Sequence, residues 1–253
     1  MSEIDVLGAG EKMRNATIEV TPCAGAAGAQ LNGVDLTRTQ SAKEMVQLKR
    51  ALLDHLVIAI PRQSLTSEQL IAFGEQWGEL FIHPNLKPSN IHPGLIAVER
   101  KPGDIRYTGS EWHTDTSHMP APPALSIMYA KTVPATGGDT VFANQYLAFA
   151  TLSDGLQRTL RGLRAIHSDA RVAGPRAALN ALRSNKTNES ADWRPTRTSH
   201  PVVRTHPDTG REALYVNVAA TLHFDGMSVE ESAPLLNYLF EHNHRPEFTY
   251  RHA

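Results

Sequence analysis

The sequence predicts a fold made mainly of β-strands with flanking helices. Two observations indicate it. Short apolar runs are broken repeatedly by glycine and proline, as in strands joined by turns, and helix-start signals occur at only a few positions. The chain has 253 residues, of which 41% are hydrophobic, which is enough for one well-buried core. We therefore expect a single domain over residues 1–253.

The N-terminal part of the chain begins with predicted strands. Residues 17–20 and 28–36 are short apolar stretches, and Gly28 and Gly33 interrupt the second one, which is typical of strands joined by tight turns. Residues 56–60 form a continuous apolar run that ends at a proline. Such a run favours a buried strand.

Helices are expected at a few places along the chain. Three of them begin at a Ser or Thr that is followed three residues later by Glu or Gln, the spacing of a capping box, and apolar residues then recur at helical intervals. A further helix is expected over 145–163, with a break near 153–155. The three capping pairs are Ser41 with Glu44, Thr66 with Gln69, and Ser228 with Glu231.

The middle of the chain, residues 79–143, is expected to hold strands and loops. Its prolines interrupt short apolar runs such as 95–98 and 125–130, which argues against long helices. The polar stretch 180–198 is interpreted as a mobile insertion that is either a lid or disordered. After it, the turn sequence at 207–210 predicts a β-hairpin.

The composition excludes several classes of partner. The charges nearly balance, with 25 Lys and Arg against 26 Asp and Glu, so binding to nucleic acid or to an acidic membrane surface is not expected. Cys23 is the single cysteine, which suits a reducing compartment. The N-terminal residues do not resemble a signal peptide, and no apolar run approaches the length of a membrane span. These features predict a soluble cytoplasmic protein.

Histidines followed two positions later by aspartate are the candidate metal ligands. In a strand, residues i and i+2 face the same side, so this spacing can direct an imidazole and a carboxylate at one ion. Two histidines and one carboxylate form a facial triad on Fe(II) that leaves positions open for an oxo-acid and O2. Four of the twelve histidines start such a pair: His113 with Asp115, His167 with Asp169, His206 with Asp208, and His223 with Asp225.

The local sequence separates these four pairs only in part. The pairs that start at His206 and His223 lie in turn sequences, where aspartate normally accepts backbone hydrogen bonds. His167 fits a strand, so it stays a candidate. His113 is favoured modestly, because Trp112 precedes it and polar residues surround it. Any one of these histidines, taken singly, is more often a structural residue than a ligand.

Several segments, taken in order, resemble a known family. They are GAQLNGVDL at 28, WGELFIHP at 77, EWHTDTSH at 111, PPALSIMYAKTVPATGGDTVFAN at 122, HPVVRTHPDTGREALYVN at 200 and RPEF at 245. In this combination the chain resembles the taurine dioxygenase and 2,4-dichlorophenoxyacetate dioxygenase (TauD/TfdA) family of iron- and 2-oxoglutarate-dependent enzymes. The resemblance implies a double-stranded β-helix, or jelly roll, with helices outside the barrel.

The resemblance also implies site residues. His113 and Asp115 match the family's Trp-His-x-Asp motif and would bind the iron as catalytic residues. Thr140, in the Gly-Gly-Asp-Thr run, would bind 2-oxoglutarate, although the same run also suits a simple turn into a strand. His83 and Thr116 match substrate-pocket positions, and His83 could equally be a buried structural residue.

The implied activity is that of a dioxygenase, an oxidoreductase with Fe(2+) and 2-oxoglutarate as cofactor and co-substrate. It would use O2 to hydroxylate a small organic acid while 2-oxoglutarate is converted to succinate and carbon dioxide, with iron and the co-substrate carrying the difficult chemistry. The expected partners are therefore small molecules. The sequence leaves open whether the chains assemble into a homo-oligomer.

The chain departs from the family pattern in two respects. Family members continue beyond the Pro-Glu-Phe segment into strands that carry a second iron-binding histidine and an arginine that pairs with 2-oxoglutarate, whereas this sequence stops at Ala253. We therefore expect the C-terminal strands to be missing and both ligands to bind poorly. The alternative is a non-catalytic relative, a pseudoenzyme that acts as a binding or structural protein.

The second departure concerns the substrate. Taurine enzymes carry a tyrosine and an asparagine where this sequence has Leu86 and Gly109. Without the phenol and the amide, hydrogen bonds that a sulfonate or an amine needs are lost. A less polar organic acid is therefore expected in place of taurine.

Overall fold

The structure is a computed structural model that describes residues 18–100, 109–177, 180, 182, 187 and 190–253. The chain divides into two compact units. The first comprises the residues up to Gly78 together with Thr136–Phe142 and Tyr250–Ala253, and the second comprises Glu79–Ala135 and Ala143–Thr249. Each unit is considered by itself, and a single domain over residues 1–253 stays a prediction.

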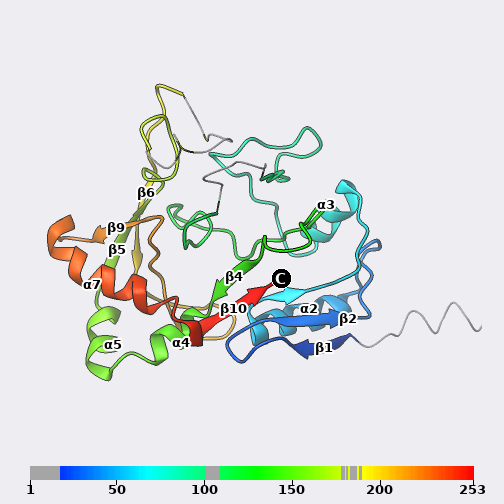
Figure 1. The fold of residues 1–253 in the computed structure, drawn as a ribbon, viewed down its shortest axis with the longest axis horizontal. Helices are drawn as coiled ribbons and strands as arrows, with labels where there is room; N and C mark the ends of the chain where they lie inside the picture. The colour runs from blue at the N-terminus through cyan, green and yellow to red at the C-terminus, as the bar shows by residue number, and fades with distance from the viewer. Residues whose placement is uncertain (1–17, 101–108, 178–179, 181, 183–186, 188–189) are drawn as a thin grey trace, which may run out of the picture. The chain divides into compact units, whose positions relative to one another are not determined.

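The first unit contains two small sheets and two helices (Figure 1). In the larger sheet β1 pairs antiparallel with β2, which pairs in parallel with β3. The strand β4 pairs with β10, and the helix α2 connects β2 to β3. The bounds are β1 Glu19–Pro22, β2 Ala29–Asn32, α2 Ala42–His55, β3 Ile58–Ala59, α3 Ser67–Glu75, β4 Thr140–Ala143 and β10 Thr249–His252.

The second unit contains a sheet of order β6-β5-β9, a hairpin β7-β8, and helices. The predicted break within the helix expected over 145–163 is confirmed, since α4 and α5 are separate. The predicted hairpin is confirmed as well, since β7 pairs antiparallel with β8. The bounds are α4 Gln145–Ala150, α5 Asp154–Arg161, β5 Arg164–Ser168, β6 Arg197–Pro201, β7 Val203–Thr205, β8 Glu212–Leu214, β9 Thr221–Phe224, α7 Val229–His242 and the short 3-10 helix η2 Pro246–Phe248.

The predicted capping boxes are all present. Ser41, Thr66 and Ser228 are the N-caps of α2, α3 and α7, and in each the side chain accepts from the third helical N–H while the Glu or Gln there accepts from the cap N–H. Each box satisfies N–H groups that the helix cannot pair internally. Helix starts were therefore predictable from residues three positions apart.

The apolar run 56–60 was predicted as a buried strand, and this prediction was wrong in part. Helix α2 ends where this run begins, because Leu56 is its C-cap. Leu56 adopts the left-handed conformation at φ 67°, and its N–H donates to the Leu52 carbonyl. Only Ile58 and Ala59 then pair as a strand, and both are half-buried. The strand is shorter than predicted because Leu56 forms the C-cap of α2.

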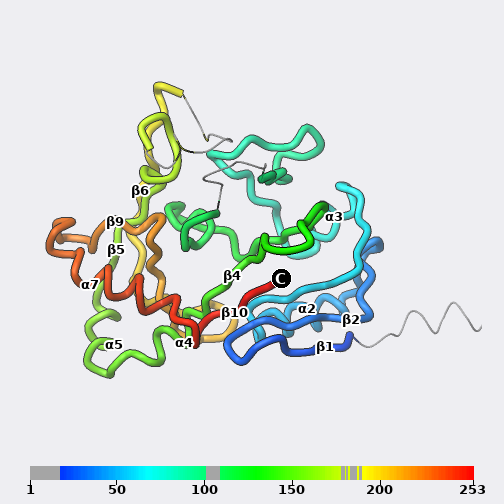
Figure 2. The backbone as a smooth tube through the Cα atoms, viewed as in Figure 1, coloured from blue at the N-terminus to red at the C-terminus, as the bar shows by residue number. Residues whose placement is uncertain are grey.

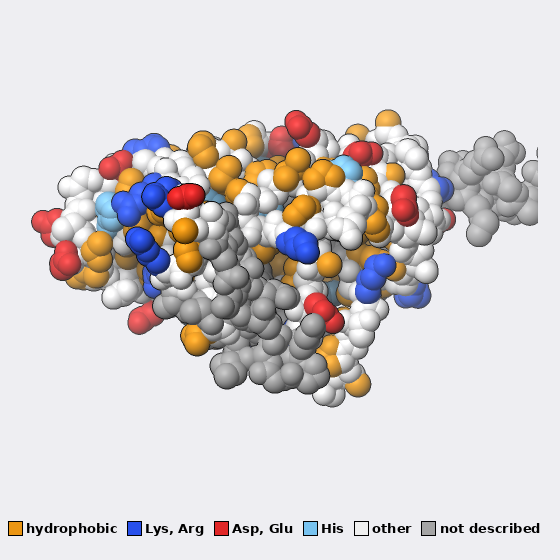
Figure 3. All heavy atoms as spheres, turned by 90° about the horizontal axis from the view of Figure 1, so that it is seen from above, with side chains coloured by type: hydrophobic (Ala, Val, Ile, Leu, Met, Phe, Trp, Pro, Cys, Tyr) orange, Lys and Arg blue, Asp and Glu red, His pale blue; other side chains and the backbone are white. Residues whose placement is uncertain are grey.

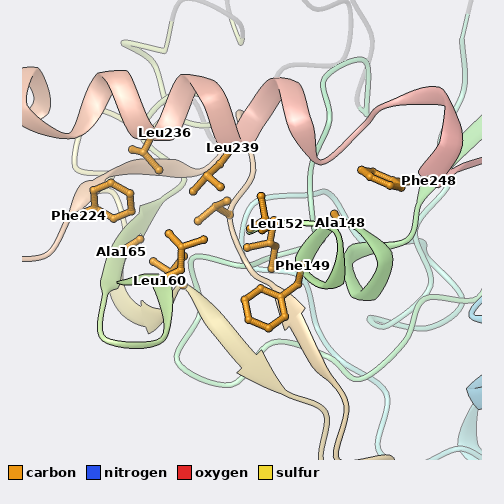
Figure 4. Packing of buried hydrophobic residues seen from close by; sticks show 12 residues of the cluster. Ala148, Phe149, Leu152, Leu160, Ala165, Phe224, Leu236, Leu239 and Phe248 are labelled. Carbon is orange, nitrogen blue, oxygen red and sulfur yellow. The ribbon is translucent and has the colours of Figure 1, made fainter. Parts of the chain in front are cut away.

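The core of the second unit lies between α7, the sheet and the helices α4 and α5. In Figure 4, Leu236 and Leu239 of α7 point towards Phe224 of β9 and towards Leu160 and Ala165. These side chains are almost fully buried, which is the main apolar stabilisation of this unit. The sheet that lies beside the candidate site therefore rests on a packed core.

Residues 79–100 and 109–135 run as loops (Figure 2). Within the described residues, the apolar runs 95–98 and 125–130 form no strand, contrary to the expectation of strands here. Several apolar side chains of this region are exposed, among them Val98, Met128 and Val133. Apolar side chains are visible at the surface in Figure 3. A strand needs a partner strand to pair its backbone groups, and no such pairing is present for these runs.

The described strands thus form small sheets alongside helices, and none of these strands is longer than five residues. The double-stranded β-helix predicted from the family stays a prediction at this level of detail. Among the described residues, no helix has the length and apolar character needed to cross a membrane.

The contact between Gly28 and Tyr250 generates a first prediction. Gly28 has φ 93°, and a Cβ built there would lie 2.6 Å from Cε1 of the Tyr250 ring. Gly28→Ala is expected to lower the free energy of unfolding by about 2 kcal/mol or more, because both the backbone and the ring contact are strained. Urea unfolding measures it. Gly25→Ala is the control, since its Cβ would meet nothing within 4 Å, and equal losses in both variants would contradict the prediction.

Candidate active site

The turn at residues 114–119 carries Asp115 and directly follows His113. The N–H of Met119 donates to the Thr116 carbonyl at 2.8 Å, which closes the turn. Side chains and carbonyls of the turn are bonded to residues on or beside the sheet β6-β5-β9, so its position is set by buried polar contacts. These bonds join Ser117 Oγ to His167 Nδ1 (3.1 Å) and Asn217 Nδ2 (3.0 Å), the His118 carbonyl to Thr198 Oγ1 (2.7 Å), and the Met119 carbonyl to His200 Nε2 (3.0 Å).

The side chains of His113 and Asp115 meet at their polar ends, with Nε2 of the ring 3.2 Å from Oδ1 of the carboxylate. Nδ1 of the same ring lies 2.7 Å from the carbonyl oxygen of Glu111. Because a carbonyl can only accept, Nδ1 carries a proton. In a neutral ring Nε2 then turns a lone pair towards the carboxylate. This contact is favourable only when a proton or a metal cation lies between the two atoms.

The geometry of this pair fits a divalent metal ion. Two bonds of about 2.1 Å place the donor atoms about 3.0 Å apart at the right angle of an octahedral site and about 3.4 Å apart at the tetrahedral angle of zinc. The 3.2 Å between Nε2 and Oδ1 lies between these two values. Both side chains are open to solvent, with 37% of His113 and 55% of Asp115 exposed. The described residues contain no group of three or more His, Cys, Asp and Glu side chains that could hold a metal. The pair by itself would therefore supply only part of a coordination shell.

Asp115 is ionised at neutral pH. The hydrogen bond from His113 is the largest influence on the pKa of Asp115, which falls to about 2 although burial opposes the change. Ser126 contributes as well, because its Oγ donates to Oδ2 at 2.5 Å. One carboxylate oxygen is thus engaged by a hydroxyl while the other faces the imidazole.

Thr116 combines an unusual backbone with an unpaired hydroxyl. Its φ is 47°, in the left-handed region that β-branched residues avoid. The side chain is buried, and Oγ1 has no hydrogen-bond partner among the described residues. Strained backbone and unsatisfied polar groups are both concentrated at functional sites. The predicted role of Thr116 as a substrate contact is compatible with this arrangement and stays a prediction.

His83 lies within electrostatic reach of the same carboxylate. Burial is the largest influence on the pKa of His83 and lowers it, with a smaller lowering from His118, while Asp115 and Asp169 act in the opposite direction. The charge of Asp115 thus acts on the His83 ring, and the expected substrate contact of His83 stays a prediction.

Thr140 is the first residue of β4 and belongs to the first compact unit, whereas His113 and Asp115 belong to the second. Its predicted contact with 2-oxoglutarate stays a prediction.

The other His-x-Asp pairs have structural partners. Nδ1 of His167 is bonded to Ser117, and the carboxylate of Asp169 accepts from two other groups. The N–H of Asp208 donates to His206 Nδ1 at 3.2 Å, within the predicted turn. Asp225 accepts from Ser199 Oγ at 2.7 Å. Turn and sheet contacts thus account for these residues.

Sequence reasoning missed three residues of this neighbourhood: Ser126, Asn85 and the structural role of Asp169. Asn85 Nδ2 donates to Asp169 Oδ2 at 2.7 Å across 84 positions of the chain. Ser126 is bonded to Asp115 across 11 positions. No local pattern marks an Asn or a Ser whose partner lies outside its own turn or helix. The histidine and aspartate pattern was the only signal available for Asp169.

Comparison with known proteins places the chain in a family. Residues 19–253 match the family model described as "Taurine catabolism dioxygenase TauD, TfdA family". The chain is 30% identical over 243 residues to the alpha-ketoglutarate-dependent 2,4-dichlorophenoxyacetate dioxygenase of Cupriavidus pinatubonensis, covering 88% of this chain and 81% of that protein. It is also 30% identical over 240 residues to the alpha-ketoglutarate-dependent sulfate ester dioxygenase of Pseudomonas putida, covering 92% and 77% respectively.

Solved structures agree with this result. A taurine dioxygenase from Burkholderia xenovorans superimposes with a TM-score of 0.77 at 35% identity, over 94% of this chain and 76% of that one. AAD-2, solved in complex with Mn(II) and N-oxalylglycine, gives a TM-score of 0.73 at 28% identity, over 94% and 84%. The chain therefore belongs to the TauD/TfdA family of alpha-ketoglutarate-dependent dioxygenases, which are oxidoreductases.

The conformation of Thr116 generates a second prediction. Thr116→Asn is expected to raise the free energy of unfolding by about 1 kcal/mol, because Asn tolerates the left-handed region better than a β-branched residue does. Urea unfolding measures the change. Thr114→Asn is the matched control, since Thr114 is exposed and is not among the residues with positive φ. The same gain in both variants would show that backbone strain at residue 116 is not its source.

Proposed function

We propose that the protein is an Fe(II)- and 2-oxoglutarate-dependent dioxygenase that hydroxylates a small organic acid, with His113 and Asp115 as two of the iron ligands. One observation carries this proposal. Because the Glu111 carbonyl places a proton on Nδ1 of His113, Nε2 of the neutral ring directs its lone pair at the carboxylate of Asp115, 3.2 Å away. Either a proton on Nε2 or a metal cation satisfies both atoms, and we assign that place to the metal.

The roles of the neighbouring residues follow from their contacts. Iron and 2-oxoglutarate supply the oxidising chemistry when bound. Glu111 holds the His113 ring through Nδ1, so that Nε2 is directed at Asp115. Ser126 holds Oδ2 of Asp115, which leaves Oδ1 directed at the same point. We assign Thr140 to 2-oxoglutarate, and His83 and Thr116 to the substrate.

The substrate class follows from positions 86 and 109. A Cβ at Gly109 would lie 3.5 Å from His113 Cε1, so any side chain there would border the metal pair. The N–H of Leu86 donates to His83 Nδ1. Both positions therefore adjoin the proposed site, and both lack a polar side chain. Of the relatives named above, one is a taurine dioxygenase, and two others act on a phenoxyacetate and on sulfate esters. Those two support an organic acid with an apolar body as the substrate.

The alternative is a non-catalytic relative. The described residues hold only two of the three expected ligands, and we propose that these 253 residues bind iron and 2-oxoglutarate weakly. A pair of ligands with no third protein donor among the described residues retains less affinity for the metal. Metal-binding and turnover measurements distinguish weak catalysis from none.

The third prediction concerns the metal. Under anaerobic conditions, adding Fe(II) and 2-oxoglutarate is expected to produce a visible charge-transfer band at high ligand concentration, with slow formation of succinate in air. His113→Ala is expected to weaken Fe(II) binding at least tenfold. His206→Ala is the matched control, because it removes a histidine of another His-x-Asp pair that lies in a turn. No band at any concentration would favour the non-catalytic alternative, and rapid turnover would contradict the proposed weakness of binding.

The fourth prediction concerns the substrate. With Fe(II), 2-oxoglutarate and O2 supplied, 2,4-dichlorophenoxyacetate is expected to increase succinate formation more than taurine does. The physical reason is that Leu86 and Gly109 offer no hydrogen bond to an amine or sulfonate. Succinate is quantified for each compound at equal concentration. Stronger stimulation by taurine would contradict the proposed substrate class.

A further inference from the structure

The ring of His83 is held in one tautomer. Its Nδ1 accepts hydrogen bonds from the backbone N–H groups of Asn85 and Leu86, both at 3.1 Å. An N–H group can only donate, so Nδ1 must present its lone pair and the proton of the neutral ring lies on Nε2. Burial, which lowers the pKa of His83, keeps the ring neutral. His83 is thus a hydrogen-bond donor through Nε2.

The side chain of Asn85 is bonded at both ends. Its Nδ2 donates to Asp169 Oδ2 at 2.7 Å, and its Oδ1 accepts from Trp193 Nε1 at 3.1 Å. A carboxylate can only accept and an indole N–H can only donate, so these two partners determine which end of the amide is which. The same residue therefore bonds His83 through its backbone and two distant segments through its side chain.

Asp169 is a fixed anchor for this amide. It directly follows β5 and is 1% exposed. Its Oδ1 accepts from the backbone N–H of Thr196 at 2.9 Å, and His118 Nε2 lies 3.7 Å from Oδ2. A carboxylate buried this deeply needs its donors, because desolvation is otherwise uncompensated. Asn85 is one of the groups that satisfy it.

The ring of Trp193 packs against Gly174, and any larger residue at position 174 would force the ring to shift. The indole ring lies against Gly174, where an added Cβ would be 2.2 Å from Cε3, and Gly174 itself has φ 84°. The ring position that delivers Nε1 to Asn85 therefore depends on close packing as well as on the hydrogen bond.

We propose that Asn85 is a positioning residue that, anchored by Asp169 and Trp193, holds His83 in the tautomer whose Nε2–H meets the acidic group of the substrate. The proposal rests on the proposed function, which makes His83 a substrate contact. Its structural basis is the convergence on Asn85 of the His83 ring, the buried carboxylate of Asp169 and the indole of Trp193. Trp193 lies two hydrogen bonds away from His83, and the proposed contact of His83 with the substrate is the third.

The first experiment measures the tautomer of His83 directly, without metal or substrate. Imidazole ¹⁵N shifts of the labelled full chain are recorded by NMR, and His83→Gln assigns the His83 signals. The intact protein is expected to show an unprotonated Nδ1 and a protonated Nε2. Trp193→Phe keeps an aromatic ring against Gly174 but removes the N–H. This variant and Asn85→Ala are expected to show shifts averaged between the two tautomers.

Trp77→Phe is the matched control. Its buried indole N–H has no hydrogen-bond partner among the described residues, and it belongs to the other compact unit. The His83 shifts are expected to be unchanged in this variant. Unchanged His83 shifts in Trp193→Phe, or an equal change in Trp77→Phe, would overturn the proposal. If Asn85→Ala does not fold, Trp193→Phe decides the question alone.

The second experiment uses turnover of 2,4-dichlorophenoxyacetate as the probe. In Trp193→Phe we expect the KM for this compound to rise about five- to tenfold while kcat stays within about twofold, because a group that orients a substrate contact acts on binding. A fall in kcat with unchanged KM would overturn the proposal. Absence of turnover in every protein would count against the proposed function only, and the NMR result would then decide the positioning role by itself.

Discussion

The hydrogen bonds that fasten the turn at residues 114–119 to the sheet determine the rest of the site. Ser117 is fully buried, and its single hydroxyl serves both His167 and Asn217. Removing that hydroxyl would leave a buried ring nitrogen and a buried amide without partners, at a cost of about 1–3 kcal/mol for each group. His113 and Asp115 are themselves exposed. The position of these two residues is therefore set by the buried hydrogen bonds of Ser117.

Two aspartates near this turn show how environment assigns a role. Asp169 is almost completely buried and accepts from an amide and a backbone N–H, so its lone pairs are committed to structure. Asp115 is 55% exposed, and one of its oxygens faces an imidazole that has its proton on the far nitrogen. Only Asp115 has electron pairs directed at a point that a metal ion can reach. Both residues are aspartates, and only their surroundings give them different roles.

The same contrast applies to the histidines. His167 is buried beside His200 and Tyr215, and burial first, then the charge of His200, lowers the pKa of His167 to about 4. This ring remains neutral at physiological pH and serves the hydrogen bond to Ser117. His113, His83 and His167 thus occupy three different positions in one polar cluster, and only the tertiary contacts distinguish a candidate ligand, a candidate donor and a structural ring.

The sequence alone determined the features that depend on residues close together in the chain. The capping boxes at Ser41, Thr66 and Ser228 were predictable because both partners lie three positions apart. The family was predictable because ordered motifs carry it. Only the tertiary structure decided which apolar runs become strands, and only it shows that the side chains of His113 and Asp115, which the family motif had already singled out, meet at their polar ends. Those outcomes depend on partners such as Asn217 for Ser117, 100 positions away, and no local pattern encodes a hydrogen bond formed across that distance.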